Sequence, residues 1–322
     1  MMRIAFSSCM FNRVFADQPV WGWIGAQAPD RLVLLGDSTY LDLKTAIPPQ
    51  VMGDDEFARH LFLRYSELIA QPQFAALVAA LPAGSVDAIW DDHDFLWNDA
   101  TGAEVHPLHT EKVRLSTAFL EAFRSALHQR LAPGSFPSAY NDAVFWDLNQ
   151  PPLTTPSIPL APDLWLHLTD GRTFRTRTLG KPESKRTIFG TAQLDRFDAA
   201  IQAAPADAVH LWASGSTIAG YQRYARDKQR LFAMAAQHRM LVLSGDIHHN
   251  DMDAFFTGGA LPLHEATSSG AAVKDTVIVG DPRRNFGLLV VDAQQVTIEL
   301  FTDNVVPPEH RRVLDRQTWV PV

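Results

Sequence analysis

The strongest constraint on the fold is a set of short apolar runs that each end in polar residues and alternate with segments of helical periodicity. Five of these runs fit buried strands, namely 4–6, 32–35, 88–90, 209–212 and 240–243. Runs of this length, separated by amphipathic segments, are typical of strands that alternate with helices. The pattern therefore predicts an α/β fold.

The segments between the runs have the spacing of amphipathic helices. In 54–70, apolar residues from Phe57 to Leu68 recur every three or four positions, which places them on one helix face. The same interpretation applies to 111–131, 191–203 and 221–237. Near the end of the chain, two apolar runs, 287–292 and 296–301, flank a short polar turn. They predict an antiparallel hairpin, and therefore mixed rather than purely parallel sheets.

Residues 149–162 contain five prolines and have the composition of a linker between domains. The chemically informative motifs, however, lie on both sides of this stretch. We therefore interpret it as a long connection within one domain and expect residues 1–322 to form a single catalytic domain.

Composition limits the partners. The chain has 28 Lys and Arg against 36 Asp and Glu, a net charge of -8, which repels phosphate backbones unless the charges are locally segregated. We therefore expect a small-molecule partner and no nucleic acid.

Cys9 is the single cysteine, so no disulfide can form within the chain. The first residues hold too few apolar positions for a signal peptide, and no run of 18 apolar residues occurs, so we expect a cytoplasmic protein without a membrane span.

Residues able to bind metal or phosphate follow four of the five predicted strands, where ligands of α/β proteins usually bind. They are Cys9, then Asp37 and Tyr40, then Asp91 to Asp94, and finally Asp246 and His248. Each has a simpler interpretation when taken alone. Cys9 fits a small buried hydrophobe, Asp37 a helix cap and Tyr40 a core residue with a wet hydroxyl. Four such clusters at strand ends are harder to explain structurally.

Two of the motifs are unusually dense. Residues 90–94 place three carboxylates around one imidazole, which would repel one another unless a cation or solvent relieved them. Residues 245–251 hold two imidazoles and two carboxylates, a density typical of metal ligands. If this second segment is extended, Asp246 and His248 point to one side and His249 to the other.

Taken in order, the motifs resemble those of the PhoD-like phosphatases, the alkaline phosphatase D family of the metallophosphoesterase superfamily. The matching pieces are Ser7-Ser8-Cys9, Gly36-Asp37-Ser38-Thr39-Tyr40, Trp90-Asp91-Asp92-His93-Asp94, Asp170 to Arg175, Gly190 to Leu194, and Gly245-Asp246-Ile247-His248. The resemblance implies a four-layer α/β fold in which two mixed sheets pack face to face between helices. It also implies a binuclear metal centre at the strand ends.

By position in that family, each candidate residue receives a role. Cys9, Asp37, Tyr40 and His248 correspond to ligands of the first metal, and Asp37, Asp92 and Asp246 to ligands of the second, so Asp37 would bridge the two ions. His93 would assist the leaving oxygen, with Asp94 orienting it. Arg172 matches a phosphate-binding arginine, although a surface role fits it equally well.

The chain departs from the family after the fourth strand, where an amide ligand is common. Ser214 to Thr217 stand there instead, so a hydroxyl or water would have to substitute, and the second metal would bind more weakly or differ in kind.

Charge and ligand type suggest which metals would bind. Deprotonated Cys9, Tyr40 and three aspartates would carry five negative charges, which a trivalent and a divalent ion balance. Thiolate and imidazole suit a transition metal and oxygen ligands a harder ion. We therefore expect Fe(III) in the first site and Ca, Mn or Zn in the second.

The resulting hypothesis is hydrolysis of a phosphoric monoester or diester by hydroxide held on the two metals. A second hypothesis is a hydrolase with Cys9 as nucleophile, but a cysteine phosphatase needs an arginine six positions further on, where this chain has Phe15. A third is a catalytically silent binding protein that keeps the fold. Nothing in the sequence indicates the oligomeric state.

Overall fold

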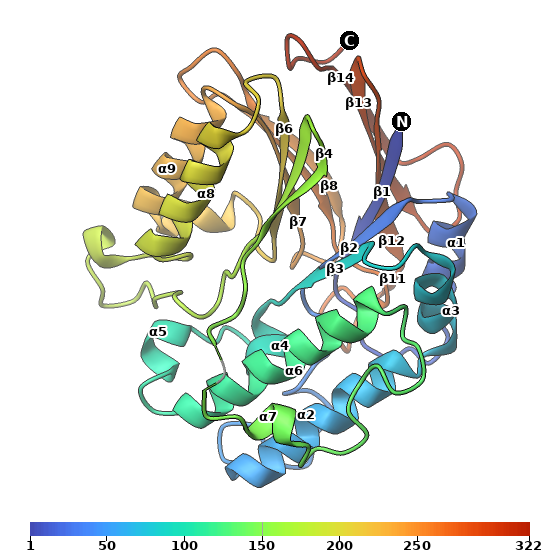
Figure 1. Cartoon of the computed structure of the whole chain (residues 1–322), viewed down its shortest axis with the longest axis vertical. Helices are drawn as coiled ribbons and strands as arrows, with labels where there is room; N and C mark the ends of the chain where they lie inside the picture. The colour runs from blue at the N-terminus through green and yellow to red at the C-terminus, as the bar shows by residue number, and fades with distance from the viewer. Residues whose placement is uncertain (150) are drawn as a thin grey trace.

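The computed structural model describes residues 1–149 and 151–322 and contains two six-stranded mixed sheets that face each other (Figure 1). The first sheet has the order β14-β13-β12-β1-β2-β3. Its strands are β1 (Met2–Ser7), β2 (Arg31–Leu35), β3 (Val86–Ile89), β12 (Asn285–Val291), β13 (Gln295–Thr302) and β14 (His310–Asp315). β1, β2 and β3 are parallel, and β12 to β14 continue the sheet in antiparallel fashion.

The second sheet has the order β4-β5-β6-β7-β9-β8. Its strands are β4 (Ser157–Ala161), β5 (Leu164–Leu168), β6 (Val209–Ser214), β7 (Arg239–Ser244), β8 (Asn250–Phe255) and β9 (Leu263–Ser268). The four central strands are parallel and the two edge strands antiparallel. A small hairpin, β10 (Val273–Lys274) and β11 (Pro282–Arg283), stands apart from both sheets.

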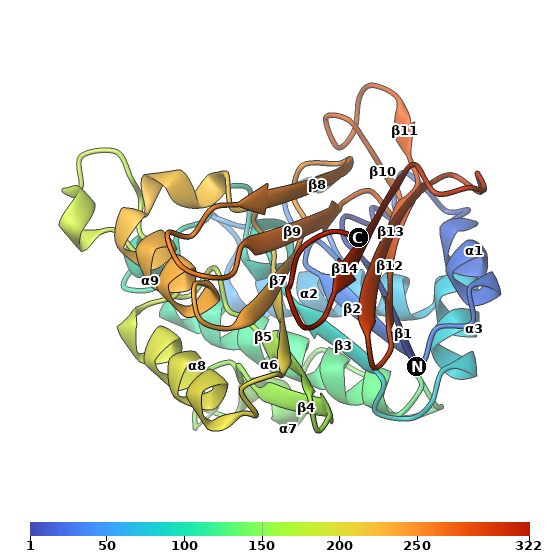
Figure 2. The same ribbon diagram turned by 90° about the horizontal axis from the view of Figure 1, so that it is seen from above.

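Helices cover the two outer faces. They are α1 (Val20–Ala26), α2 (Asp54–Ile69), α3 (Pro72–Ala80), α4 (Asp92–Phe95), α5 (Gly102–Val105), α6 (Thr110–His128), α7 (Ala143–Trp146), α8 (Thr191–Ala203) and α9 (Ala225–Ala235), with short 3-10 turns η1 (Glu183–Lys185) and η2 (Gly220–Arg223). Figure 2 shows α8 and α9 outside the second sheet and α1 and α3 outside the first. The result is the predicted four-layer α/β arrangement.

Alternation along the strands explains the layering. In β1, Ile4 and Phe6 join the core between the two sheets, whereas Ala5 joins the core under α2 and α6. In β6, Leu211 faces the other sheet and Trp212 packs under α8 and α9. Because both faces of β1, β2, β3, β6 and β7 are buried, these strands contain the apolar runs from which they were predicted.

The elements predicted from periodicity are present with small boundary shifts. The helix predicted over 191–203 is α8, and those over 54–70 and 111–131 are α2 and α6. The segment 221–237 begins as the 3-10 turn η2 and becomes α9 only at Ala225. The hairpin is β12 and β13, with Val291 opposite Val296. The proline-rich stretch leads into β4, an edge strand that tolerates Pro159, which has no N–H.

In the described part of the chain, no helix combines the length and the apolar character needed to cross a membrane.

Candidate metal centre

The carboxyl ends of β1, β2, β3 and β7 meet at one place between the two sheets. Main-chain hydrogen bonds fix the loops there: the N–H of Cys9 donates to the carbonyl of Gly36, and the N–H of Met10 donates to that of Asp37. On the other side, the N–H of Ala272 donates to the carbonyl of Cys9. The topology therefore brings together residues separated by more than 200 positions.

Two groups of side chains at this place have the spacing of metal ligands. Asp37, Asp92 and His93 form one group, and Asp37, Asp91, Asp92 and Asp246 form the other, with the potential ligand atoms of each group within 4.8 Å of one another. Asp37 and Asp92 belong to both groups. Asp91, one of the residues noted after the third predicted strand, had no ligand role assigned to it from the sequence.

Cys9 and Tyr40 lie beside these groups and are fully buried. The Cys9 thiol donates to Oδ2 of Asp37 across 3.6 Å, and the Tyr40 ring packs on the His93 ring with centroids 4.4 Å apart. Burial raises the pKa of Cys9 to about 11 and raises that of Tyr40 well above its usual range. Both groups therefore need a nearby cation before they can act as thiolate and phenolate.

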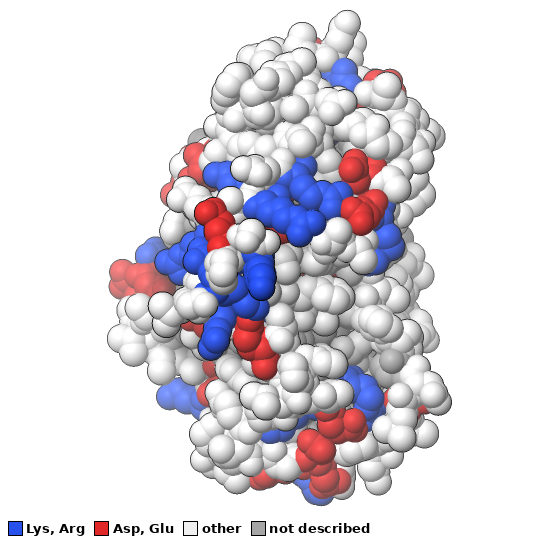
Figure 3. Space-filling view, turned by 90° about the vertical axis from the view of Figure 1, so that its left-hand side faces the viewer, with Lys and Arg blue, Asp and Glu red and all other residues white. Residues whose placement is uncertain are grey.

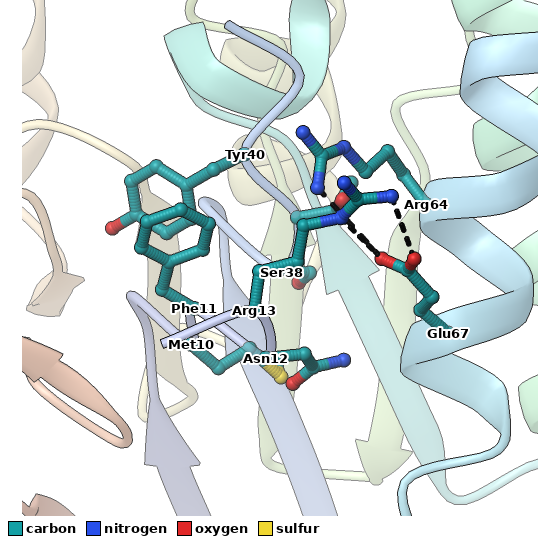
Figure 4. Close-up of a pocket in the computed structure, with 9 residues that line it drawn as sticks. Met10, Phe11, Asn12, Arg13, Ser38, Tyr40, Arg64 and Glu67 are labelled. Carbon is teal, nitrogen blue, oxygen red and sulfur yellow. Dashed lines mark hydrogen bonds and ion pairs between the residues drawn. The ribbon is translucent and has the colours of Figure 1, made fainter. Parts of the chain in front are cut away.

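Figure 4 shows Tyr40 at the wall of a neighbouring pocket. Its hydroxyl points away from the Arg13, Arg64 and Glu67 side chains that form the other wall, and its ring lies against Phe11 with centroids 4.8 Å apart. The Tyr40 hydroxyl is buried and has no hydrogen-bond partner in the described residues. Neither arginine satisfies it, so the hydroxyl is available to a metal ion.

The donor set fits metal ions. Oδ2 of Asp91, like the Tyr40 hydroxyl, is buried without a hydrogen-bond partner among residues 1–149 and 151–322. Burial, Cys9 and the neighbouring carboxylates Asp92 and Asp91 raise the pKa of Asp37, although His93 opposes them. Buried carboxylates and unsatisfied oxygens at this density are costly unless a cation pairs with them.

His248 is prepared as a nitrogen ligand. Its Nδ1 lies 2.8 Å from the carbonyl of Asp275, so Nδ1 carries the proton and donates, which leaves Nε2 with a free lone pair. The main-chain N–H of His248 donates to the Ser269 hydroxyl, which also lies 3.3 Å from the Cys9 sulfur. Ser269 therefore links two candidate ligands and was not found from the sequence.

The backbone is strained at four of the candidate ligands. Left-handed φ angles between 50° and 77° occur at Cys9, Asp37, Asp246 and His248. Residues other than glycine seldom occupy this region. The expectation of an extended segment from Asp246 to His248 is therefore wrong, because the chain turns twice there. His249 is exposed.

His93 has an acidic partner, but it is not the expected one. Nδ1 of His93 lies 2.7 Å from Oδ1 of Asp42. Asp94 instead accepts from the main-chain N–H groups of Asp91 and Ser38, and so fixes the loops after β3 and β2. Although burial lowers the pKa of His93, the carboxylates of Asp37, Asp42 and Asp92 outweigh it and raise that pKa to about 10.

Arg172 is buried and paired rather than free. Its Nε lies 2.5 Å from Oδ1 of Asp91, and its Nη2 lies 3.2 Å from Oδ1 of Asp92. Burial opposes ionisation of Asp92, but Arg172 and His93 hold the pKa of Asp92 below its usual range. The alternative of a surface arginine is excluded by its 3% exposure, and its contacts are with carboxylates of the site.

Asp91 lies close to the loop after β6, the segment in which the sequence has no amide ligand. A Cβ atom on Gly215, in the loop after β6, would lie 2.6 Å from Oδ1 of Asp91. The absence of a side chain at Gly215 therefore lets Asp91 approach this loop. The neighbouring Ser214 hydroxyl lies 2.5 Å from that of Tyr221, so it is engaged within the loop.

The fold is that of a known class. The sequence matches no protein-family profile and no curated protein. Among solved structures, that of PhoD aligns over 100% of this chain and 71% of its own, with a TM-score of 0.67 and 13% identity. A predicted phosphoesterase from Streptococcus pneumoniae TIGR4 aligns over 98% and 97%, with a TM-score of 0.35 and 9% identity. The alignment with PhoD shows that the chain has the PhoD fold, with two mixed sheets facing each other between helices.

Proposed function

We propose that this protein is a metal-dependent phosphoric ester hydrolase with a binuclear centre. The observation that carries the proposal is the pair of ligand groups that share Asp37 and Asp92 at the carboxyl ends of strands from both sheets. All their members are buried except Asp246. Because each sheet contributes residues, the proposal treats residues 1–322 as a single catalytic domain.

Cys9, Asp37, Tyr40 and His248 would hold the first metal, and Asp37, Asp92 and Asp246 the second. We add Asp91 to the second set, since its free oxygen lies in the same group. Thiolate, phenolate and imidazole favour Fe(III), and the carboxylates a divalent ion such as Ca, Mn or Zn. Bound there, the two ions would polarise a phosphoryl oxygen and lower the pKa of an attacking water.

His93 acts on the leaving group. The Asp42 carboxylate, beside Nδ1, favours the protonated imidazole. Asp42 holds the proton on Nδ1 and fixes the ring, so Nε2 can give its proton to the departing oxygen. Asp42 is in turn fixed by the N–H of Asn98, 2.8 Å from its other oxygen.

Arg172 has a different role from a simple phosphate clamp. Its contacts with Asp91 and Asp92 hold these carboxylates in position and limit their mutual repulsion. A phosphate group could attract Arg172 only in competition with them. Arg175, which donates from Nη1 to the Ser216 hydroxyl and has no carboxylate partner in the described residues, is the better candidate for binding phosphate.

The contacts of Cys9 argue against its use as a nucleophile. Its sulfur is fully buried between two hydroxyls, and its pKa of about 11 leaves almost no thiolate at neutral pH.

The experiment compares hydrolysis of bis(4-nitrophenyl) phosphate and 4-nitrophenyl phosphate by the wild type and Asp37→Ala. Since Asp37 belongs to both ligand groups, we expect a loss of at least about 100-fold on either substrate. Asp55→Asn, at an exposed position of α2, is the matched control and should retain the wild-type rate. Retention of the rate in Asp37→Ala would refute the proposal.

A further inference from the structure

Positive charge is concentrated in two short segments, although the chain as a whole is acidic. Residues 172–186 contain six Lys and Arg with one acidic residue, and residues 223–230 contain four with one. The rest of the chain has 18 basic residues against 34 acidic ones. The charges are therefore locally segregated, which removes the reason for excluding polyanionic partners.

Hydrogen bonds join the two segments into one surface. The Tyr224 hydroxyl donates to the carbonyl of Thr176 across 2.9 Å. Oδ2 of Asp227, in α9, accepts from the Thr187 hydroxyl at 2.7 Å and from the N–H of Ile188 at 2.6 Å. Figure 3 shows Lys and Arg side chains gathered on the corresponding side of the molecule. We name the basic surface by its members Arg175, Arg177, Lys185, Arg186, Arg223, Arg226 and Lys228.

These seven cations are not neutralised by neighbours. In the described part of the chain, no carboxylate lies within 4.0 Å of any of them, whereas Lys181 is paired with Glu104 and Arg230 with Asp195. Arg177, Lys185, Arg223 and Arg226 are exposed. Because no carboxylate of the protein pairs with these cations, they are available to bind an anionic ligand.

The basic surface adjoins the candidate metal centre. Arg172, at the start of the first segment, contacts Asp91 and Asp92. Three residues later, Arg175 donates to Ser216 in the loop after β6, next to Gly215, whose α-carbon faces the Asp91 carboxylate. A chain lying on the basic surface would therefore reach the mouth of the site.

The side chains on the surface favour a ligand recognised by charge alone. Its two segments contain two aromatic residues, of which Tyr224 is buried and Phe174 is 43% exposed. Surfaces that bind single-stranded nucleic acid add several exposed rings on which bases stack. We propose that the basic surface binds a flexible chain of closely spaced phosphates without bases, namely inorganic polyphosphate.

The test is a binding measurement, so it does not depend on the proposed hydrolysis. Binding of inorganic polyphosphate is measured by calorimetry at 50 mM and 300 mM salt, with wild type and the triple variant Arg177→Gln, Lys185→Gln, Arg226→Gln. None of these three side chains makes a hydrogen bond in the described structure that the substitution would break. We expect the wild type to bind more weakly at the higher salt, and the variant to bind about fivefold more weakly or worse at 50 mM.

The control for net charge is Arg59→Gln, Arg130→Gln, Arg311→Gln, at exposed positions on α2, after α6 and on β14. These three side chains are hydrogen-bonded within the protein, so circular dichroism first checks that both triple variants are folded. The control variant should bind like the wild type. Equal weakening in both triple variants would show a general charge effect and overturn the proposal. Tighter binding of a thymidine oligonucleotide of equal charge would also overturn it, because the bases would then contribute. Absence of binding at 50 mM salt would refute it directly.

Discussion

Oδ1 of Asp42 lies 2.7 Å from Nδ1 of His93, so the histidine proposed to assist the leaving group is fixed by a residue 51 positions earlier in the chain. The carboxylate that follows it in the sequence, Asp94, binds main-chain N–H groups instead. Two functions, positioning of His93 and fixing of the loops, therefore belong to different aspartates, which the sequence of residues 90–94 does not reveal. Asp42 positions the acid, and Asp94 shapes the loops.

This division predicts different effects at the two positions. His93→Ala should lose at least about 100-fold in turnover, and less on a nitrophenyl ester than on an alkyl ester, because a good leaving group needs little protonation. Asp42→Asn should show the same dependence on the leaving group. Asp94→Asn should chiefly lower the free energy of unfolding. If the Asp42→Asn loss is equal for good and poor leaving groups, Asp42 does not act through His93.

The contacts of Arg172 predict a large effect on stability. Arg172→Ala leaves Asp91 and Asp92 buried without their cation, so the free energy of unfolding should fall by about 3–5 kcal/mol in chelator. Arg230→Ala removes a partly exposed ion pair with Asp195 and should cost under about 1 kcal/mol. Urea denaturation of both variants checks this. A similar small cost at the two positions would contradict the account of Arg172.

The close approach of Asp91 to the loop after β6 predicts that Gly215 cannot be replaced. In Gly215→Ala the new methyl group would meet the Asp91 carboxylate, so we expect a loss of about 1–3 kcal/mol in unfolding free energy. Gly220→Ala is the control in the same loop, since its nearest contact would be Ser216 Cβ at 3.8 Å. Thermal unfolding should separate the two, and equal stability would show that Asp91 can move away freely.

A pair of buried histidines predicts the pH dependence of stability. Burial and the nearby His210 lower the pKa of His167 to about 3, and burial lowers that of His210 to about 4. Their rings share a 3.0 Å hydrogen bond beneath α8. Because both pKa values lie below the unfolded value of about 6.5, the unfolded state binds more protons between about pH 4 and 6.5. Their contribution to stability is therefore complete above this range and is lost as the pH falls through it.

Urea denaturation across this range tests the histidine pair. Each histidine adds at most about 1.4 kcal/mol per pH unit to the slope of stability against pH. The slope should be smaller in His167→Gln and unchanged in His310→Gln, which alters a half-exposed histidine. An unchanged slope in His167→Gln would show that other groups set the pH dependence.

The fold was largely predictable because most of its central strands and its long helices have regular apolar patterns. Two central strands were missed: β5, although it is mainly apolar, and β9, whose buried positions include His264, Glu265 and Thr267. β8, at an edge of the second sheet, has mostly exposed or partly buried positions, and β14 begins with three charged or polar residues, His310 to Arg312. Neither strand has an apolar pattern. Their strand conformation depends on pairing with β9 and β13, which is tertiary information.

The candidate site was predictable where its residues follow strands, as Asp37, Asp92 and Asp246 do. Asp42 carries no such signal, because it lies in a loop and contacts the site only after folding. Ser269 follows β9, but β9 itself was not predicted from the sequence. The extended geometry expected for Asp246 and His248 was wrong because left-handed turns direct these side chains. Arg172 was noticed for its chemistry, but its pairing with Asp91 depends on a contact between the two sheets.

The metal content of protein purified without added metal decides whether the chain holds a binuclear centre. We expect tightly bound iron and a divalent ion in near-equal amounts. Asp37→Ala should remove both ions, whereas Asp92→Ala, which alters a residue proposed for the second metal alone, should remove only the divalent ion. Wild-type protein without metal that is fully active in chelator would contradict the account.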